Sequence, residues 1–252
     1  IRESKFEKYI FSLLISFVAK SSMSVSNSVK TNYFRDEYGP FKCEHTVIRD
    51  WTDDSLYQLK TMYPKPTCFE DFSKVIVMVG RLEMWKGQHV FLDALKLIES
   101  SELENVGVFI IGGDVVGSSK ERYAEEIKKS ASELGVHMLG ERSDVPALLS
   151  SANISIHASV TPDPFPGVVV ESLMTGVYCI GANGGGVPEM IENGFSGALF
   201  SVGNSSDLAA KIAWALNHPS ESREIAKHGS ETIRKLTSKS SILDDLTKLY
   251  HK

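Results

Sequence analysis

The chain has 252 residues, of which 42% are hydrophobic and 23% charged, and its formal net charge is -5. This composition is typical of a globular protein rather than a disordered chain or a membrane bundle, and the negative charge argues against a nucleic-acid partner. The three cysteines lie far apart, without the spacing of a metal site or a disulfide framework, so we expect a reducing, cytoplasmic setting.

The chain opens with an apolar stretch at residues 9–19, which follows a beginning of mixed charge. It is too short to span a bilayer and lacks a small-residue cleavage site, so we predict a buried helix rather than a signal peptide. Because Ile1 already reads as the middle of a helix, we expect the chain to be a fragment of a longer protein.

Small α/β elements follow, and they end in a polar linker. Residues 24–26 read as the end of a strand, 27–38 as a helix and 43–48 as a second strand. Pro64 and Pro66 then remove amide donors and stiffen the chain, as an interdomain linker requires. We therefore place a domain boundary near residue 70.

From residue 75 the pattern alternates regularly between apolar runs and amphipathic helices. Near-continuous apolar runs are expected when helices cover both faces of a parallel sheet, so we predict an α/β fold with a doubly wound, Rossmann-like sheet behind a small incomplete α/β segment. The predicted strands are 75–79, 106–111, 136–139, 154–157, 177–180 and 198–200, and the predicted helices are 88–99, 120–134, 145–151, 167–175 and 188–192. Helices from residue 207, over 222–236 and over 240–250 complete the chain.

The loop after the first strand of this sheet carries two cations between two glycines, in the order Gly80, Arg81, Lys86 and Gly87. Ligands bind beyond the carboxyl ends of parallel strands, and an arginine fork with a mobile lysine could clamp a diphosphate there. The alternative is that both are solvated surface cations. The flanking glycines, which let a backbone approach a ligand closely, favour the clamp.

A second unusual loop leads into the helix predicted at 167–175. Pro166 suits its first position, and the amides of Gly167 and Val168 could bind an anion at the helix start. Asp163 and Glu171 could converge on a polyol, since each carboxylate accepts two hydroxyl hydrogen bonds. The alternative is that Asp163 is a turn residue and Glu171 a solvated helix residue.

Two glycine-rich loops are weaker signals. Residues 181–189 contain three consecutive glycines, which can expose amides to an anion but also form ordinary tight turns. Residues 112–117 lack the G-x-G-x-x-G spacing of a dinucleotide fold and give poor support for a dehydrogenase.

Read in order, these loops resemble the C-terminal half of the GT-B glycosyltransferases of family 4, the glycosyl transferases of group 1. The resemblance implies that residues 1–70 are the end of an N-terminal acceptor domain with a linker. It makes 71–236 the nucleotide-sugar donor-binding domain and 237–252 a helix that crosses back. The resemblance is carried by Gly80–Leu82 with Lys86 and Gly87, Ile110–Gly113, Leu139 and Gly140, Asp144, Leu148 and Leu149, Pro162–Glu171, and Gly185 and Gly186 with Glu189.

The resemblance implies a retaining transfer of a sugar from a UDP- or GDP-linked donor. Arg81 and Lys86 would hold the diphosphate and stabilise the leaving charge, while Glu171 would bind the ribose. Asp163 stands where the family has a glutamate one methylene longer, and the resemblance implies that it contacts the sugar hydroxyls. These four are the expected catalytic residues, and the further donor-binding positions are Gly80, Leu139, Gly140, Pro166, Gly167, Val168 and Val169.

We expect no metal and no cofactor besides the donor, because the sequence contains no Asp-x-Asp pair. By resemblance, the acceptor is a glycan or a lipid-linked glycan. A peripheral membrane contact on the cytoplasmic face would lie in the rest of the N-terminal domain.

Other functions stay open from the residues alone. A nucleotide-binding module without catalysis would keep Arg81 and Lys86 but need no Asp163, and a sugar-nucleotide epimerase could share the architecture. A glycoside hydrolase using Asp163 and Glu171 would leave the anion site unexplained. His157, at the end of a predicted strand, reads as a packed residue rather than a catalyst.

Overall fold

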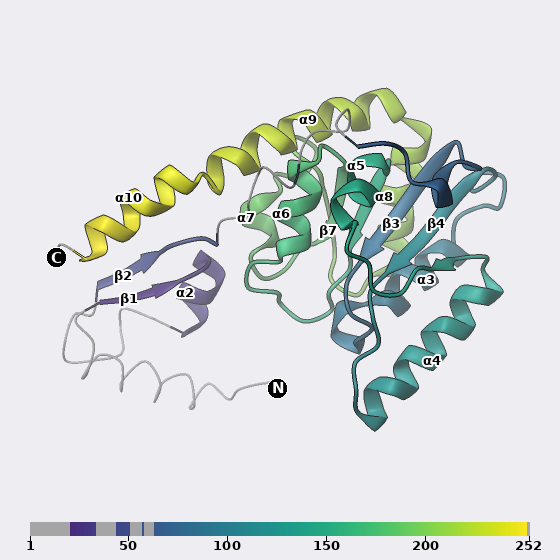
Figure 1. Cartoon of the computed structure of the whole chain (residues 1–252), viewed down its shortest axis with the longest axis horizontal. Coiled ribbons are helices and arrows are strands. Elements are labelled where there is room, and N and C mark those ends of the chain that lie inside the picture. Colours follow the sequence, from purple (N-terminus) through teal and green to yellow (C-terminus); the bar gives the residue numbers. More distant parts are fainter. Residues whose placement is uncertain (1–20, 34–43, 51–56, 58–62, 251–252) are drawn as a thin grey trace.

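The computed structural model describes residues 21–33, 44–50, 57 and 63–250. The helix predicted at 9–19 and the end of the one predicted at 27–38 lie outside them. The first described elements are two parallel strands, β1 (Ser21–Ser24) and β2 (Glu44–Val47), and the helix α2 (Asn27–Tyr33). They form a small unit beside the larger body of the molecule (Figure 1).

The larger body is built on a six-stranded parallel sheet in the order β5-β4-β3-β6-β7-β8. The chain enters this sheet at its central strand β3, adds β4 and β5 on one side, and then crosses over to β6 on the other side of β3. This is the order of a doubly wound Rossmann-like sheet, so the predicted fold is confirmed. The strands are β3 (Lys74–Val79), β4 (Val106–Ile111), β5 (His137–Met138), β6 (Ile154–His157), β7 (Tyr178–Ala182) and β8 (Ala198–Phe200).

Helices cover both faces of this sheet because its strands are apolar on both sides. Along β3, Ile76 and Met78 pack with α3 (Gln88–Lys96), α4 (Ser118–Glu133) and α8 (Ser205–Asn217). Val75 and Val77 point the opposite way, as the pleat of a strand requires, into a second layer of core. The helices on that side are α5 (Val145–Ser151), α6 (Gly167–Met174), the short α7 (Val187–Met190) and α9 (Pro219–Leu236).

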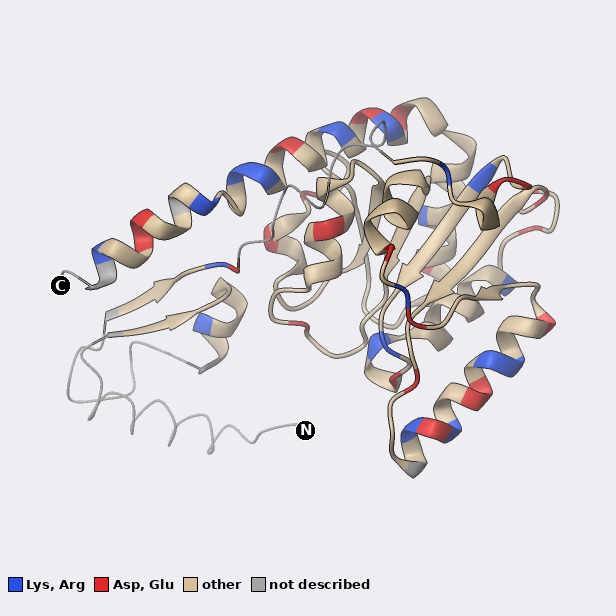
Figure 2. Ribbon diagram, in the orientation of Figure 1, with Lys and Arg blue, Asp and Glu red and all other residues tan. Residues whose placement is uncertain are grey.

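The exposed sides of the helices are polar. Acidic and basic residues alternate along α4 and α9 (Figure 2). The last helix, α10 (Lys239–Tyr250), continues from α9 toward the side of the molecule that holds β1 and β2 (Figure 1). No helix in the described part of the chain combines the length and apolar character needed to cross a membrane.

The sequence analysis missed two short 3-10 helices, η1 (Thr67–Phe69) and η2 (Met84–Lys86). Both are single tight turns, too short to show a helical period. The strand predicted at 24–26 was misplaced, because β1 ends at Ser24. The loop between Gly80 and Gly87, after β3, contains η2. This turn brings Lys86 to the edge of the sheet.

Candidate active site

The loops after β3 and β6 lie side by side where the strand order reverses, because these two strands are neighbours in the sheet. The amide of Val160 donates to the carbonyl of Trp85 at 2.8 Å. Gly87 has a left-handed backbone (φ 78°), and a Cβ there would lie 1.9 Å from the carbonyl oxygen of Ala158. Only glycine fits this close approach, so the sequence fixes how the two loops pack.

The ammonium of Lys86 is the best-positioned cation of the site. It donates to Oδ2 of Asp163 at 3.0 Å and lies 3.8 Å from the ring centroid of Trp85. The two charged side chains are only 18% and 10% exposed. Burial works against the ionised carboxylate, but contact with His157 and Lys86 outweighs it and holds the pKa of Asp163 below its usual value. Asp163 is therefore a charged partner of the lysine, not a solvated turn residue.

His157 ends β6 directly behind this pair. Its Nε2 lies 3.7 Å from Oδ2 of Asp163 and 3.0 Å from the hydroxyl of Ser159. The side chain is 5% exposed, and its Nδ1 has no hydrogen-bond partner among the described residues. The histidine is packed, as predicted, and it also supports Asp163 from the core side.

Arg81, predicted to share the clamp with Lys86, lies on the same loop but has a different environment. Its guanidinium is 63% exposed and pairs with Oε2 of Glu83 at 3.1 Å. Glu83 was missed by the sequence analysis, since its spacing from Arg81 is typical of any surface loop. The loop therefore presents one largely buried cation, Lys86, and one exposed cation, Arg81.

The start of α6 has the expected amides, with one correction. Pro166 is the N-cap of α6, not its first residue, because its ψ of 114° is extended rather than helical. The helix begins at Gly167. Its amide and that of Val168 have no acceptor among the residues that the structure describes. They remain available to an anion at the positive end of the helix dipole.

Glu171 lies one turn into α6 and is half-buried. Burial raises the pKa of Glu171, and a hydrogen bond from the Tyr57 hydroxyl opposes that rise. The guanidinium of Arg234 fixes this tyrosine by donating to its carbonyl at 2.9 Å and to the carbonyl of Met174 at 2.8 Å. Tyr57 could not be recognised from the sequence, because it precedes the sheet in a segment without periodicity.

The glycine-rich loop before α7 does not present all its amides to a ligand. The amide of Gly186 donates to the carbonyl of Asp163 at 2.8 Å. Gly185 has φ 61°, and a Cβ there would lie 2.1 Å from the same carbonyl oxygen. The loop instead holds the Asp163 segment in place.

The predicted base-contacting residues Leu139 and Gly140 follow β5 at the same edge of the sheet. The amide of Leu139 donates to Ile110 and the carbonyl of Gly140 accepts from Gly112, at 3.0 and 2.8 Å. Within the described residues, no group of three or more histidine, cysteine and acidic side chains is arranged to hold a metal ion.

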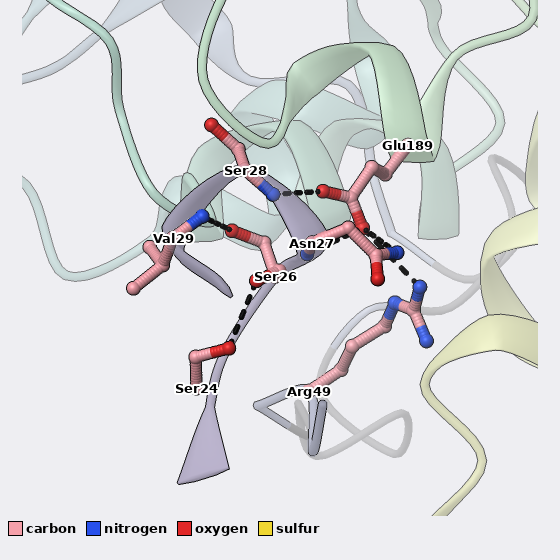
Figure 3. Close-up of polar contacts among 7 residues, drawn as sticks. All are labelled: Ser24, Ser26, Asn27, Ser28, Val29, Arg49 and Glu189. Carbon is pink, nitrogen blue, oxygen red and sulfur yellow. Dashed lines mark hydrogen bonds and ion pairs between the residues drawn. The ribbon is translucent and has the colours of Figure 1, made fainter. Parts of the chain in front are cut away.

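Glu189 on α7 connects this body to the small N-terminal unit (Figure 3). Its carboxylate accepts hydrogen bonds from the amide of Asn27 at 3.1 Å, the side chain of Asn27 at 2.9 Å and the amide of Ser28 at 2.9 Å. Arg49 adds an ion pair at 3.3 Å. One carboxylate on the larger body thus binds the beginning of α2 and the segment after β2.

Three comparisons describe what the chain is similar to. Residues 63–232 match the model of the family "Glycosyl transferases group 1". The chain is 24% identical over 185 residues to spore coat protein SA of Bacillus subtilis, covering 71% of this chain and 49% of that protein. It is 30% identical over 132 residues to an Escherichia coli UDP-Gal:alpha-D-GlcNAc-diphosphoundecaprenol alpha-1,3-galactosyltransferase, covering 52% of this chain and 33% of that enzyme.

Among solved structures, HepE of Anabaena in complex with UDP superposes with a TM-score of 0.84 at 23% identity. The match covers 99% of this chain and 68% of HepE, and it supports the same fold. The chain spans about half or less of the length of the two curated relatives named above.

Proposed function

This chain belongs to the glycosyl transferases group 1 family, and we propose that it carries the donor side of a retaining glycosyltransferase. The enzyme would move a hexosyl group from a UDP- or GDP-linked sugar to a glycan or lipid-linked acceptor. The observation that carries the proposal is the ion pair of Lys86 with Asp163, on the segment that leads into α6, where the first two amides have no acceptor among the described residues. Residues 71–236 would form the donor domain and 237–252 the crossing helix.

In the proposed reaction, the bond between the sugar and the diphosphate breaks and negative charge grows on the leaving phosphate. Lys86 and Arg81 would stabilise that charge, with the amides of Gly167 and Val168 from the other side. The lysine need not leave Asp163, since an ammonium has three donors. We expect no metal requirement, because these residues already supply cations and amides for the leaving group.

From the diphosphate, the rest of the donor would extend along the edge of the sheet. Asp163 would contact the sugar hydroxyls and Glu171 the ribose hydroxyls. The Glu171 carboxylate already accepts one hydrogen bond from Tyr57, and its remaining lone pairs can accept hydrogen bonds from the ribose. Backbone near Leu139 and Gly140 would contact the base, and Gly80, Pro166 and Val169 would shape the pocket around the diphosphate.

The relatives support a nucleotide-sugar donor. The Escherichia coli enzyme is named for a UDP-linked galactose and a diphosphoundecaprenol-linked acceptor, and HepE binds UDP. We propose a cytoplasmic enzyme with a similar class of donor. Acceptor binding and a peripheral membrane contact would belong to the part of those proteins that this chain does not cover.

The test is calorimetric titration of the chain with UDP, GDP and ADP in the presence of EDTA. We expect one nucleotide to bind saturably and the double variant Arg81→Ala, Lys86→Ala to lose that binding. Lys129→Ala, an exposed lysine on α4, is the matched control and should bind as the wild type does. Absence of binding by all three nucleotides would reject the proposed donor site.

A second titration separates a transferase donor site from a plain nucleotide-binding module. Asp163→Asn removes the charge but keeps a polar side chain of similar size. If Asp163 contacts the sugar, this variant should weaken UDP-sugar binding more than UDP binding. An equal loss for both ligands would mean that the aspartate acts only through Lys86, as a module without catalysis would need.

A further inference from the structure

The side chain of Lys86 is held from two sides before any donor is present. Its ammonium contacts the Trp85 ring face at 3.8 Å and Asp163 at 3.0 Å. A free lysine side chain samples many rotamers, and a ligand that binds it must otherwise overcome the loss of that entropy. Fixing the ammonium in advance therefore strengthens its contact with an incoming anion.

Trp85 is itself held by hydrogen bonds to its side chain and to its backbone. Its indole N–H donates to Oε2 of Glu83 at 3.1 Å, and its backbone carbonyl accepts from Val160 at 2.8 Å. The first bond fixes the edge of the ring and the second ties the residue to the loop after β6. Both bonds favour the position in which the ring face lies against the ammonium.

Glu83 is the centre of this arrangement. It is buried, and its two oxygens accept from Lys120 of α4 at 2.6 Å, from Arg81 at 3.1 Å and from the Trp85 indole at 3.1 Å. The hydrogen bond from Lys120 is the main cause of the lowered pKa of Glu83, so the carboxylate is charged at neutral pH. One buried anion therefore connects α4 with Arg81 and, through the Trp85 indole, with the residue that contacts Lys86.

We propose that Trp85 is a positioning residue for Lys86 in donor binding, with Glu83 as its anchor. The inference rests on the proposed function, because the anion that Lys86 would bind is the donor diphosphate. Trp85 acts through the lysine: its ring attracts the ammonium by a cation–π contact and prevents it from turning toward solvent. Glu83 prevents the ring from rotating away.

A double-mutant cycle tests the contact without any nucleotide. The free energy of unfolding is measured for the wild type, Trp85→Leu, Lys86→Ala and the double variant. The proposal requires the cost of Trp85→Leu to be smaller once Lys86 is absent, since the ring then has no ammonium to hold. Equal costs in both backgrounds would overturn it.

Titration with UDP, or with whichever nucleotide binds, tests the consequence. Trp85→Leu should raise the Kd about tenfold, and Trp85→Phe, which keeps a ring face but loses the indole N–H, should raise it less. Trp214→Leu is the matched control, because Trp214 stacks on His218 of the N-cap of α9, away from the loop. An unchanged Kd in Trp85→Leu, or an equal loss in Trp214→Leu, would overturn the proposal.

The two experiments separate the inference from the proposed function. If the wild type binds no nucleotide, the proposed donor site fails, and the role of Trp85 in donor binding fails with it. If the wild type binds but the unfolding cycle shows no coupling, only the role of Trp85 is wrong.

Discussion

The large body and the small N-terminal unit are held together by different forces. The six-stranded sheet has apolar core on both faces, with side chains such as Ile76 and Ile110 fully buried. The unit of β1, β2 and α2 is attached through the polar contacts of Glu189, with Val25 packing beside them. A hydrophobic core separates only at a large cost, whereas charge-assisted hydrogen bonds can be exchanged for water.

This difference indicates which contacts can be removed without disturbing the core of the sheet. The donor residues proposed above come mainly from loops on the rigid sheet. Among the described residues, the Glu189 carboxylate supplies hydrogen bonds and an ion pair to the N-terminal unit, and these contacts lie outside the core of the sheet (Figure 3). Tyr57 precedes the sheet in the sequence, but it packs against the core of the larger body and donates a hydrogen bond to Glu171.

The largest expected effect is in the core of the sheet. Ile110→Ala should destabilise the protein by about 2–5 kcal/mol, since it leaves a cavity between packed layers. Met23→Ala, at an exposed position on β1, should change the stability by less than about 0.5 kcal/mol. Urea unfolding of both variants measures the contrast. Similar losses in the two variants would contradict the division into a core and an attached unit.

Removing the carboxylate of Glu189 should loosen the small unit alone. Glu189→Ala leaves the amides of Asn27 and Ser28 without their acceptor, at a cost of about 1–3 kcal/mol. Hydrogen exchange should accelerate in α2 while β3 and β4 stay protected. Glu192→Ala, an exposed neighbour, is the control. Faster exchange throughout the sheet would show that the contact supports the core instead.

Tyr57→Phe should have a smaller effect, of about 1 kcal/mol, because it removes one hydrogen bond to Glu171. That bond lowers the pKa of Glu171, so its loss should raise the pKa further. Nucleotide binding that needs the ionised carboxylate should then require a higher pH in the variant. We would measure the nucleotide Kd between pH 5 and 8. Identical pH profiles would show that Tyr57 does not act on Glu171.

The smallest effect should be a pH dependence of opposite sign at the two carboxylates. The folded-state pKa of Asp163 is lowered, so its contribution to stability is present above the unfolded pKa and is lost as the pH falls through the folded value. The pKa of Glu171 is raised, so its contribution is present below the unfolded pKa and is lost as the pH rises through the folded value.

Melting temperatures between pH 3 and 7 measure this difference. Relative to the wild type, Asp163→Asn should lose less stability on acidification and Glu171→Gln should lose more. Parallel curves for the two variants would contradict the opposite environments that we assign to these carboxylates.

The sequence by itself determined the order and type of the elements in the sheet. The strands predicted at 106–111, 154–157 and 198–200 have the bounds found in the structure, because strands buried on both faces are continuous apolar runs. These features are local, so a local pattern reveals them. Gly87 and Gly185 were singled out for an approach to a ligand or an anion, whereas in the structure they allow the backbone to pass close to the carbonyls of Ala158 and Asp163.

Only the tertiary structure decided which side chains meet. The contacts of Trp85 with Lys86, of Tyr57 with Glu171 and of Glu189 with the start of α2 depend on the strand order and on how distant loops pack. No periodicity connects the members of the last two pairs, which are far apart in the chain. The buried Lys86 and the exposed Arg81 cannot be told apart in the sequence, because their burial and their partners are set by the fold around them.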